Sequence, residues 1–287
     1  MKIGLIGCGR VGLALCYLIK DRVDIIGVYD IKKENQKRAI KILKIEKNPT
    51  FKNLIKESDV LFFTTPDDEI LNAFKRAVIY FDDKKIRYCF HFSGILPAEI
   101  FPKGNRIFRG SLHPYATFPR IIIPPRLDKI YLFFQGDYSA YKIAGRIFGG
   151  SNFIIKKIKK EHKGYCHLTG VYASNLLVGL ITGILNLTKK MRWGERELRE
   201  VVLPLMEQTL QNIRVSGLRY ALSGPIVRGD IETIKRHIEL IKNDRRLFSI
   251  YRILSSYLIL YAPYNKRDTI MKLLKAKRKS KGEYEFN

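Results

Sequence analysis

The chain of 287 residues is long enough for two domains of ordinary size, each with its own core. Its composition, 46 % hydrophobic and 28 % charged, is that of a soluble globular protein, and its four cysteines form no CxxC pair, which excludes a cysteine-based metal site. The formal charge of +26 would suit nucleic acid, a membrane surface or an anionic substrate, but we favour a lysine-rich surface without a polyanionic partner.

The first twelve residues contain a dinucleotide-binding motif. A short apolar run at 3–6 leads into a GxGxxG sequence, the apolar spacing then becomes helical, and a second apolar run ends on Asp30. In such motifs the glycines allow a tight turn, a close approach of backbone N–H groups to a pyrophosphate and close helix–sheet packing, while the acid binds the ribose. The alternative is a glycine-rich turn that binds nothing. We predict a dinucleotide site formed by Gly7, Gly9, Arg10, Val11, Gly12 and Asp30.

Segments typical of strands and helices alternate up to residue 158, which favours a mainly parallel sheet covered on both faces. Beyond residue 162 the pattern is helical throughout. The sequence therefore predicts an α/β plus all-α protein, with a Rossmann dinucleotide-binding domain over 1–158 and a helical substrate and dimerisation domain with a basic tail over 159–287. The predicted strands are 2–7, 25–30, 60–65, 86–93, 106–113, 129–135 and 152–158. The predicted helices include 35–45, 67–80, 138–148, 195–216, 231–242 and 247–261.

Three predicted strands end on polar residues, at the edge of the sheet where ligands of such folds bind. At the first end, Thr65 is expected to cap a helix that begins with Pro66, and the backbone of both residues is expected to line the cofactor. The acids that follow, beginning with Asp67, are expected to face the helix dipole. The other two ends carry Ser93 and His113, for which a catalytic role and a scaffold role are both open.

The segment 164–188 has no charged residue and is long enough to span a bilayer. Its polar side chains are equally typical of the central helix of a soluble domain or dimer, and we prefer that interpretation. His167 and Asn175 lie within an arc of about 80° on one helix face, and Ser174 lies close to the same line. These side chains either cap neighbouring helices or face the nicotinamide and substrate, and we favour the second role.

The loop 222–230 contains two glycines and a proline that fix its course. Arg228 in this loop is suited to hold a carboxylate or phosphate with two hydrogen bonds, so we predict that it binds an anionic substrate together with Ser174. Asp230 is predicted to be the N-cap of the helix that starts at Ile231.

Several longer motifs occur together between residue 1 and about residue 262: GCGRVG (7–12), TPDD (65–68), HFSG (91–94), SLHPYATF (111–118), His167 ahead of ASN (173–175), LPL (203–205), Asn212 and SGPIVRGD (223–230). In these motifs the chain resembles a Rossmann-like family with its own C-terminal helical domain of unassigned function, related to pyrroline-5-carboxylate reductase, ketopantoate reductase and 6-phosphogluconate dehydrogenase. The resemblance implies a 6-phosphogluconate-dehydrogenase-like helical domain, a homodimer built through that domain and an active site between the domains.

One position departs from the better-known relatives. Hydroxyacid dehydrogenases and ketopantoate reductases of this superfamily place a lysine four residues before the asparagine of this helix, where it protonates the developing alkoxide. The corresponding residue here is Val171, which cannot donate a proton. His167 or His113 is then expected to be the general acid, unless the substrate is an imine that needs less assistance.

These inferences predict an NAD(P)-dependent oxidoreductase that transfers hydride to or from a small anionic carbonyl or imine substrate. His113, His167, Asn175 and Ser93 are expected at the reacting carbon. The charge of Asp30 favours NAD slightly, whereas Lys32 and Lys33 keep NADP open. The alternatives are a non-catalytic dinucleotide-binding sensor or regulatory protein, which Val171 favours, and a ketopantoate-reductase-like activity with a general acid other than lysine.

Location and partners follow from simpler features. Arg10 interrupts the N-terminal apolar run, which argues against a secretory signal, so we expect a cytoplasmic protein without a membrane association. The partners expected are a small-molecule substrate and a second copy of the chain, with no metal and no nucleic acid. The basic segment 266–281 is interpreted as a solvated helix or frayed tail, with nucleic-acid binding through 266–287 as the alternative.

Overall fold

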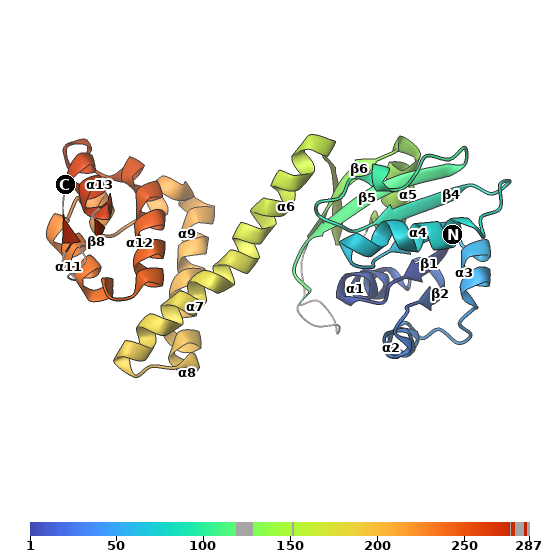
Figure 1. The fold of residues 1–287 in the computed structure, drawn as a ribbon, viewed down its shortest axis with the longest axis horizontal. Coiled ribbons are helices and arrows are strands. Elements are labelled where there is room, and N and C mark those ends of the chain that lie inside the picture. The colour runs from blue at the N-terminus through green and yellow to red at the C-terminus, as the bar shows by residue number, and fades with distance from the viewer. Residues whose placement is uncertain (119–128, 151, 276, 279–283, 286–287) are drawn as a thin grey trace. The chain divides into compact units, whose positions relative to one another are not determined.

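A seven-stranded sheet organises the first part of the chain in the computed structural model (Figure 1). The structure describes residues 1–118, 129–150, 152–275, 277–278 and 284–285. The strand order is β2-β1-β3-β4-β5-β6-β7, and neighbouring strands are parallel except for the antiparallel pair of β5 and β6. The strands are β1 (Lys2–Ile6), β2 (Asp24–Tyr29), β3 (Val60–Phe63), β4 (Arg87–His91), β5 (Ile107–Tyr115), β6 (Ile130–Gly136) and β7 (Phe153–Lys157).

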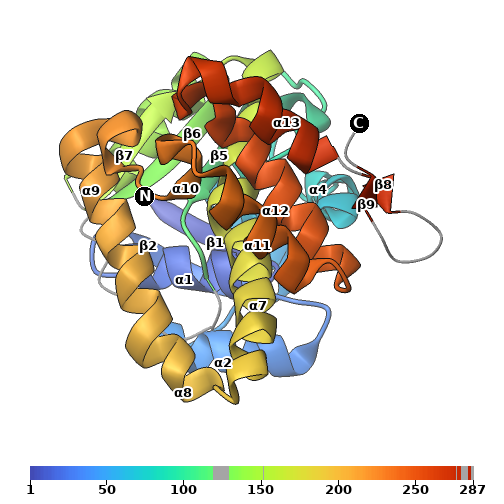
Figure 2. The same cartoon turned by 90° about the vertical axis from the view of Figure 1, so that its left-hand side faces the viewer.

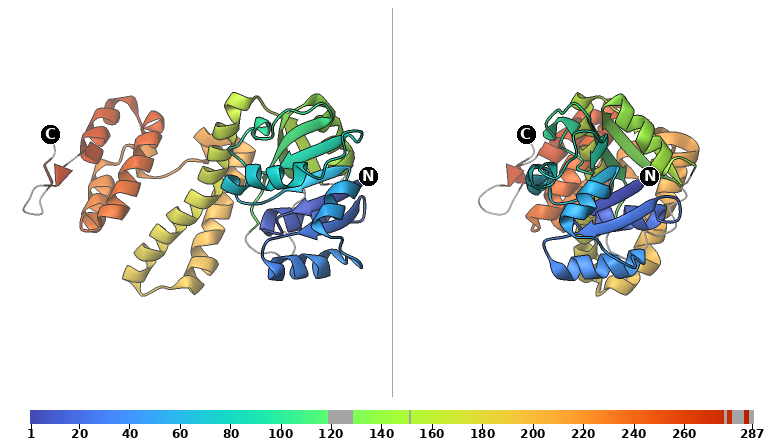
Figure 3. Two further views of the ribbon diagram at one scale, coloured as in Figure 1. Left: turned by 45° about the vertical axis from the view of Figure 1, so that its right-hand side comes forward. Right: turned by 90° about the vertical axis from the view of Figure 1, so that its right-hand side faces the viewer.

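The central strands are continuous apolar runs because helices cover both faces of the sheet (Figure 3). In β3 all four residues are buried, and they alternate between two core clusters. Phe62 packs in the cluster that includes α1 and α5, whereas Phe63 packs in the cluster that includes α4. The helices of this part are α1 (Arg10–Ile19), α2 (Lys33–Leu43), α3 (Phe51–Glu57), α4 (Ile70–Val78) and α5 (Tyr138–Phe148).

The sheet changes direction of growth at β1, since β2 lies on one side of it and β3 on the other. In open parallel sheets, ligands bind outside the carboxyl ends of the strands at such a switch point. The predicted Rossmann domain is therefore confirmed, and the predicted strand ends after β1, β3, β4 and β5 are positioned to form a site.

The second compact unit, Leu176–Asn287, is mainly helical. Helices α10 to α13 share a core that includes Ile234 and Ile238. Helix α13, in the segment expected to be solvated or frayed, buries Ile270 in the same core. Helix α9 has no buried residue and is joined to α7 through the turn that contains α8 (Figure 2). The elements are α7 (Leu177–Thr188), α8 (Glu195–Glu197), α9 (Leu203–Ala221), α10 (Pro225–Arg228), α11 (Ile231–Ile241), α12 (Arg245–Leu258), α13 (Arg267–Lys275), β8 (Lys277–Arg278) and β9 (Tyr284–Glu285).

The two compact units divide between Asn175 and Leu176, later in the chain than the boundary predicted at residue 158. Helix α6 (Lys163–Val171) lies with the first unit, and Tyr115 on β5 donates a hydrogen bond from its hydroxyl to Thr169 Oγ1 at 3.2 Å. A π-helical segment, η4 (Tyr172–Leu176), continues α6 into α7. The resulting helix, Lys160–Met191, is long and apolar enough to cross a membrane, a criterion that central helices of soluble proteins also meet.

Candidate active site

The glycine motif forms the turn between β1 and α1, and two of its glycines are required by close packing. Gly7 has a φ of +88°, and a Cβ there would lie 2.7 Å from the backbone nitrogen of Thr65. A Cβ on Gly12 would lie 2.1 Å from Thr64 Oγ1. Gly9 differs, because the nearest atom to its Cβ position is the Thr64 carbonyl oxygen at 3.7 Å. The protein thus leaves open space at Gly9, as a bound pyrophosphate would require.

Asp30 follows β2 and closes the same turn from the other side. Its Oδ2 accepts a hydrogen bond from the Cys8 backbone N–H at 2.7 Å, and its Oδ1 accepts one from the Lys32 N–H at 2.8 Å. The Gly7 N–H donates to the Tyr29 carbonyl oxygen at 2.8 Å. These bonds hold the carboxylate of Asp30 beside the glycine turn, at the position predicted for the ribose.

A pocket of about 300 Å³ lies at this turn, with Gly7, Gly9, Asp30 and Thr65 in its lining. Among the residues that the structure describes, the buried Thr65 Oγ1 has no hydrogen-bond partner. A buried hydroxyl without a partner is costly, which sets this segment apart from an ordinary turn. The open space at Gly9 and the anchored carboxylate fit a dinucleotide. Of the other predicted contacts, Val11 packs against the core and Arg10 begins α1.

The interpretation of Thr65 as a helix cap is wrong. The 3₁₀-helix that follows, η1 (Asp67–Glu69), begins after Pro66 and has no side-chain cap. Asp67 lies in the first turn of η1, as expected, and its Oδ2 also accepts a hydrogen bond from Ser93 Oγ at 2.7 Å. The segment from Thr65 to Asp67 therefore lines the pocket at one end and holds Ser93 at the other.

Ser93 and His113 lie after β4 and near the end of β5, and α6 brings His167 to them. The rings of His113 and His167 are 5.3 Å apart and nearly perpendicular. Gly94 lies against the second ring, since a Cβ on it would be 2.2 Å from His167 Nδ1. Ser93 Oγ also accepts the backbone N–H of Leu96 at 2.9 Å, which fixes the loop after β4. The structure thus brings three of the four predicted catalytic residues into one cluster.

His113 is neutral at physiological pH. Burial lowers its pKa to about 4, assisted by the positive charge of Lys163 and by His167. Its Nδ1 lies 3.3 Å from the Phe92 carbonyl oxygen, which can only accept a hydrogen bond, so we assign the proton to Nδ1. The other ring nitrogen is then an acceptor, and His113 is unsuited to the expected role of general acid.

Lys163, the first residue of α6, was not predicted as a site residue. It is 2 % exposed, and its Nζ donates a hydrogen bond to the Ser93 carbonyl oxygen at 2.6 Å. Its position four residues before His167 was a usable signal, because residues at that spacing share one face of a helix.

Asn175 and Ser174 lie outside this cluster, and Arg228 belongs to the second unit. Asn175 is exposed at the end of the first unit, and Ser174 Oγ lies 2.8 Å from the Gly170 carbonyl oxygen and 2.9 Å from Asn175 Oδ1, either of which can accept its single hydroxyl proton. Both residues belong to η4, and π-helical turns are frequent at functional sites. Arg228 ends α10 in the second unit. The predicted N-cap Asp230 is confirmed, since its carboxylate accepts the Thr233 N–H at 3.2 Å.

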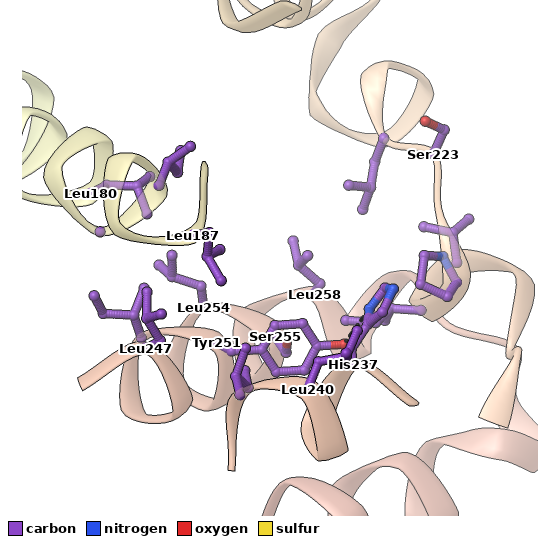
Figure 4. A pocket seen from close by; sticks show the side chains of 18 residues that line it. Leu180, Leu187, Ser223, His237, Leu240, Leu247, Tyr251, Leu254, Ser255 and Leu258 are labelled. Carbon is purple, nitrogen blue, oxygen red and sulfur yellow. Dashed lines mark hydrogen bonds between the residues drawn. The ribbon is translucent and has the colours of Figure 1, made fainter. Parts of the chain in front are cut away.

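The second unit contains an apolar pocket of about 560 Å³ between α7, α11 and α12 (Figure 4). Leucine side chains from these helices, including Leu180, Leu240 and Leu254, line it. Its polar groups include His237, whose Nδ1 lies 3.2 Å from the hydroxyl of Tyr251. Across the described ranges, no group of three His, Cys, Asp or Glu side chains is arranged to hold a metal ion.

Known proteins share parts of this arrangement. Residues 130–258 match the family model described as Domain of unknown function (DUF2520). The predicted resemblance to a family with a C-terminal domain of unassigned function is confirmed. The match begins at β6 of the sheet and continues to the end of α12, and no curated protein sequence matches the chain.

Solved structures share the fold over most of the chain. A candidate NADP oxidoreductase from Bacteroides fragilis is 18 % identical, with a TM-score of 0.72, and the match covers 90 % of this chain and 97 % of that one. A protein from Thermotoga maritima is 22 % identical, with a TM-score of 0.67 and coverage of 91 % and 98 %. Pyrroline carboxylate reductase from Plasmodium falciparum, solved with NADP bound, is 13 % identical, with a TM-score of 0.61 and coverage of 96 % and 98 %. At these identities the likeness establishes the fold.

Proposed function

We propose that the protein is an NAD(P)-dependent oxidoreductase that transfers hydride to or from a small anionic carbonyl or imine substrate. The observation that carries this proposal is the segment from Thr65 to Asp67. Thr65 lines the pocket at the glycine turn, and Asp67 holds Ser93 in the cluster with His113 and His167. A dinucleotide bound at Gly9 would thus lie close to titratable side chains, as hydride transfer requires.

Each group has a defined task in this proposal. The backbone of Gly7 and Gly9 binds the pyrophosphate, and Asp30 accepts hydrogen bonds from the ribose. A bound nicotinamide supplies or accepts the hydride. Ser174 and Asn175 assist in orienting the substrate.

We further propose a modest preference for NAD. Both carboxylate oxygens of Asp30 accept backbone N–H groups, so its negative charge is fixed where a 2′-phosphate would have to lie. Lys32 and Arg76 also line the pocket and offset part of this repulsion. The structural relatives are described with NADP in two cases and with NAD in another, the Cupriavidus necator semialdehyde dehydrogenase NAD-binding protein.

The test begins with the cofactor. Millimolar NADH or NADPH should raise the melting temperature, because a ligand that binds only the native state stabilises it in proportion to the logarithm of its concentration. Cofactor oxidation is then measured at 340 nm with a panel of small 2-oxo acids and cyclic imino acids. The absence of any melting shift with either nucleotide contradicts the proposal.

A second candidate is a dinucleotide-binding sensor without turnover, which the apolar side chain of Val171 favours. Tight nucleotide binding with no oxidation across the whole panel would support this candidate. A third candidate is a ketopantoate-reductase-like activity with a general acid other than a lysine at position 171. Turnover restricted to branched 2-oxo acids would support that activity.

We also propose that the protein is a cytoplasmic homodimer that associates through its helical unit. Helix α9 has no buried residue, and apolar side chains such as Leu205, Leu210 and Leu218 are more than half exposed on it. The same unit carries the apolar pocket beside α7 and α12. An exposed apolar helix and an apolar pocket on one chain are complementary across a two-fold axis.

A further inference from the structure

Lys163 is a buried titratable residue beside the cluster of Ser93, His113 and His167. The sequence motifs gave it no role. Its ammonium group donates to the Ser93 carbonyl oxygen at 2.6 Å, and the hydroxyl of the same serine donates to Asp67 at 2.7 Å. Ser93 is thus held by a cation on one side and a carboxylate on the other. The next residue, Gly94, touches the His167 ring. Lys163 therefore contacts Ser93 directly and lies on the same helix as His167.

The hydrogen-bonding capacity of Lys163 exceeds what its protein neighbours use. An ammonium group has three N–H donors. Within the described part of the chain, the bond to Ser93 is the one recorded for Lys163 Nζ. Because further donors remain, the group has hydrogen-bonding capacity beyond its contact with Ser93.

The charges around Lys163 divide the cluster into an acid and a base. Burial lowers the pKa of Lys163 to about 8, while Asp67 and Cys166 act in the opposite direction, so the group is mainly protonated at neutral pH and still able to release its proton. The same positive charge contributes to the low pKa values of His113 and His91. Two neighbouring groups with opposite protonation states are the usual arrangement for acid and base roles.

We propose that Lys163 is the proton donor of this site, a role that rests on the proposed oxidoreductase function. The carbonyl carbon of the substrate gains a hydride from the reduced nicotinamide, and the π electron pair moves to the oxygen. Lys163 Nζ gives that oxygen a proton, which yields the alcohol, the oxidised nucleotide and a neutral amine that is reprotonated from water. Lys163 thereby supplies the acid that Val171 cannot provide from two turns later on the same helix.

The experiment compares the wild type with Lys163→Met, Lys163→Arg and the control Lys160→Met, which removes an exposed lysine just before α6. NADH and NADPH binding is measured first by fluorescence, and we expect similar affinities in all four proteins. If the wild type binds neither nucleotide, the proposed function is wrong. If the Lys163 variants bind the nucleotides normally and differ from the wild type only in turnover, the difference tests the role of Lys163.

Two readouts then decide the role of Lys163. In ¹³C NMR of lysine Cε, the resonance that Lys163→Met removes should titrate near pH 8 with nucleotide bound, and a midpoint above 10 would overturn the proposal. With glyoxylate as the carbonyl probe, Lys163→Met should lower kcat by about 10²- to 10⁴-fold. Lys163→Arg keeps the charge but should also lose turnover and the alkaline limb of the pH profile. Full activity in Lys163→Arg would overturn the proposal, because a guanidinium keeps its proton at these pH values. The absence of turnover by the wild type with glyoxylate and with every member of the carbonyl panel would overturn it as well.

Discussion

Gly9 offers the sharpest test at the scale of single residues. A side chain there meets no protein atom closer than 3.7 Å from its Cβ, so a substitution should be tolerated by the fold. We expect Gly9→Glu to abolish the rise in melting temperature with NADH, because it places a carboxylate where the pyrophosphate would lie. The nucleotide-free melting temperature should change by only a few degrees.

The control for this variant is Gly145→Glu, at an exposed position of α5 where a Cβ meets nothing within 4 Å. Calorimetry with and without NADH should show a normal nucleotide response in the control. A normal response in Gly9→Glu as well would mean that the dinucleotide does not bind at the glycine turn.

The neutral histidines predict how stability depends on pH. Burial lowers the pKa of His113 to about 4 and that of His91 to about 3, below the ordinary value of 6.5. The folded state therefore binds fewer protons than the unfolded state between these values, and the free energy of unfolding should fall as the pH drops from 6.5 towards 4. Urea denaturation at pH 7, 6 and 5 measures this slope. His113→Gln should reduce the slope.

Residue-scale prediction from sequence succeeded where the motif fixes the geometry and failed where a partner comes from a distant segment. Gly7 and Asp30 took their expected places because the turn itself requires them. Thr65 was misread as a helix cap, since its actual environment depends on the pocket, and the contact of Asp67 with Ser93 was not foreseen. Lys163 was missed for the same reason, because its contact with Ser93 is seventy residues away along the chain.

At the scale of elements, the contact between α6 and the loop after β4 depends on a missing side chain. A Cβ on Gly94 would lie 2.2 Å from His167 Nδ1, so Gly94→Ala should displace the His167 ring and destabilise the fold by about 1–3 kcal/mol through overpacking. Urea denaturation measures the cost, and the NMR resonance of His167 reports the displacement.

Gly164→Ala is the matched comparison, because Gly164 lies in α6 and a Cβ there meets nothing within 4 Å. It should stabilise the helix by about 0.5–1 kcal/mol. Equal effects of the two substitutions would show that the close contact of Gly94 with His167 has no energetic weight.

Most helices and strands could be predicted from the sequence, but their pairing and the boundary between the units could not. The seven strands follow from apolar runs bounded by turns, and each predicted run overlaps an observed strand. The antiparallel pairing of β5 with β6 was not predicted, because periodicity carries no information on direction. The boundary at residue 158 reflected the end of the last strand, whereas α6 is held to the first unit by contacts such as Tyr115 with Thr169.

At the scale of the whole molecule, the proposed dimer gives a direct prediction. Leu210→Glu on α9 introduces a charge into an exposed apolar surface, which should weaken self-association without disturbing the monomer. Light scattering after size-exclusion chromatography should give twice the chain mass for the wild type and a lower mass for the variant.

Ile79→Lys, at an exposed apolar position after α4, is the control and should remain dimeric. A wild-type protein that is monomeric at micromolar concentration contradicts the dimer. Recovery of the wild type only with detergent would instead favour the membrane interpretation of the helix Lys160–Met191.

One continuous helix carries Lys163 and His167 near its start and then enters the unit proposed to self-associate. Self-association that orders the helical turns after Asn175 should also reduce fraying of the turns that carry Lys163 and His167, because consecutive turns of a helix form cooperatively. The turnover rate per chain should therefore fall when the protein is diluted below the dissociation constant of the dimer, under conditions in which the Rossmann domain is still folded.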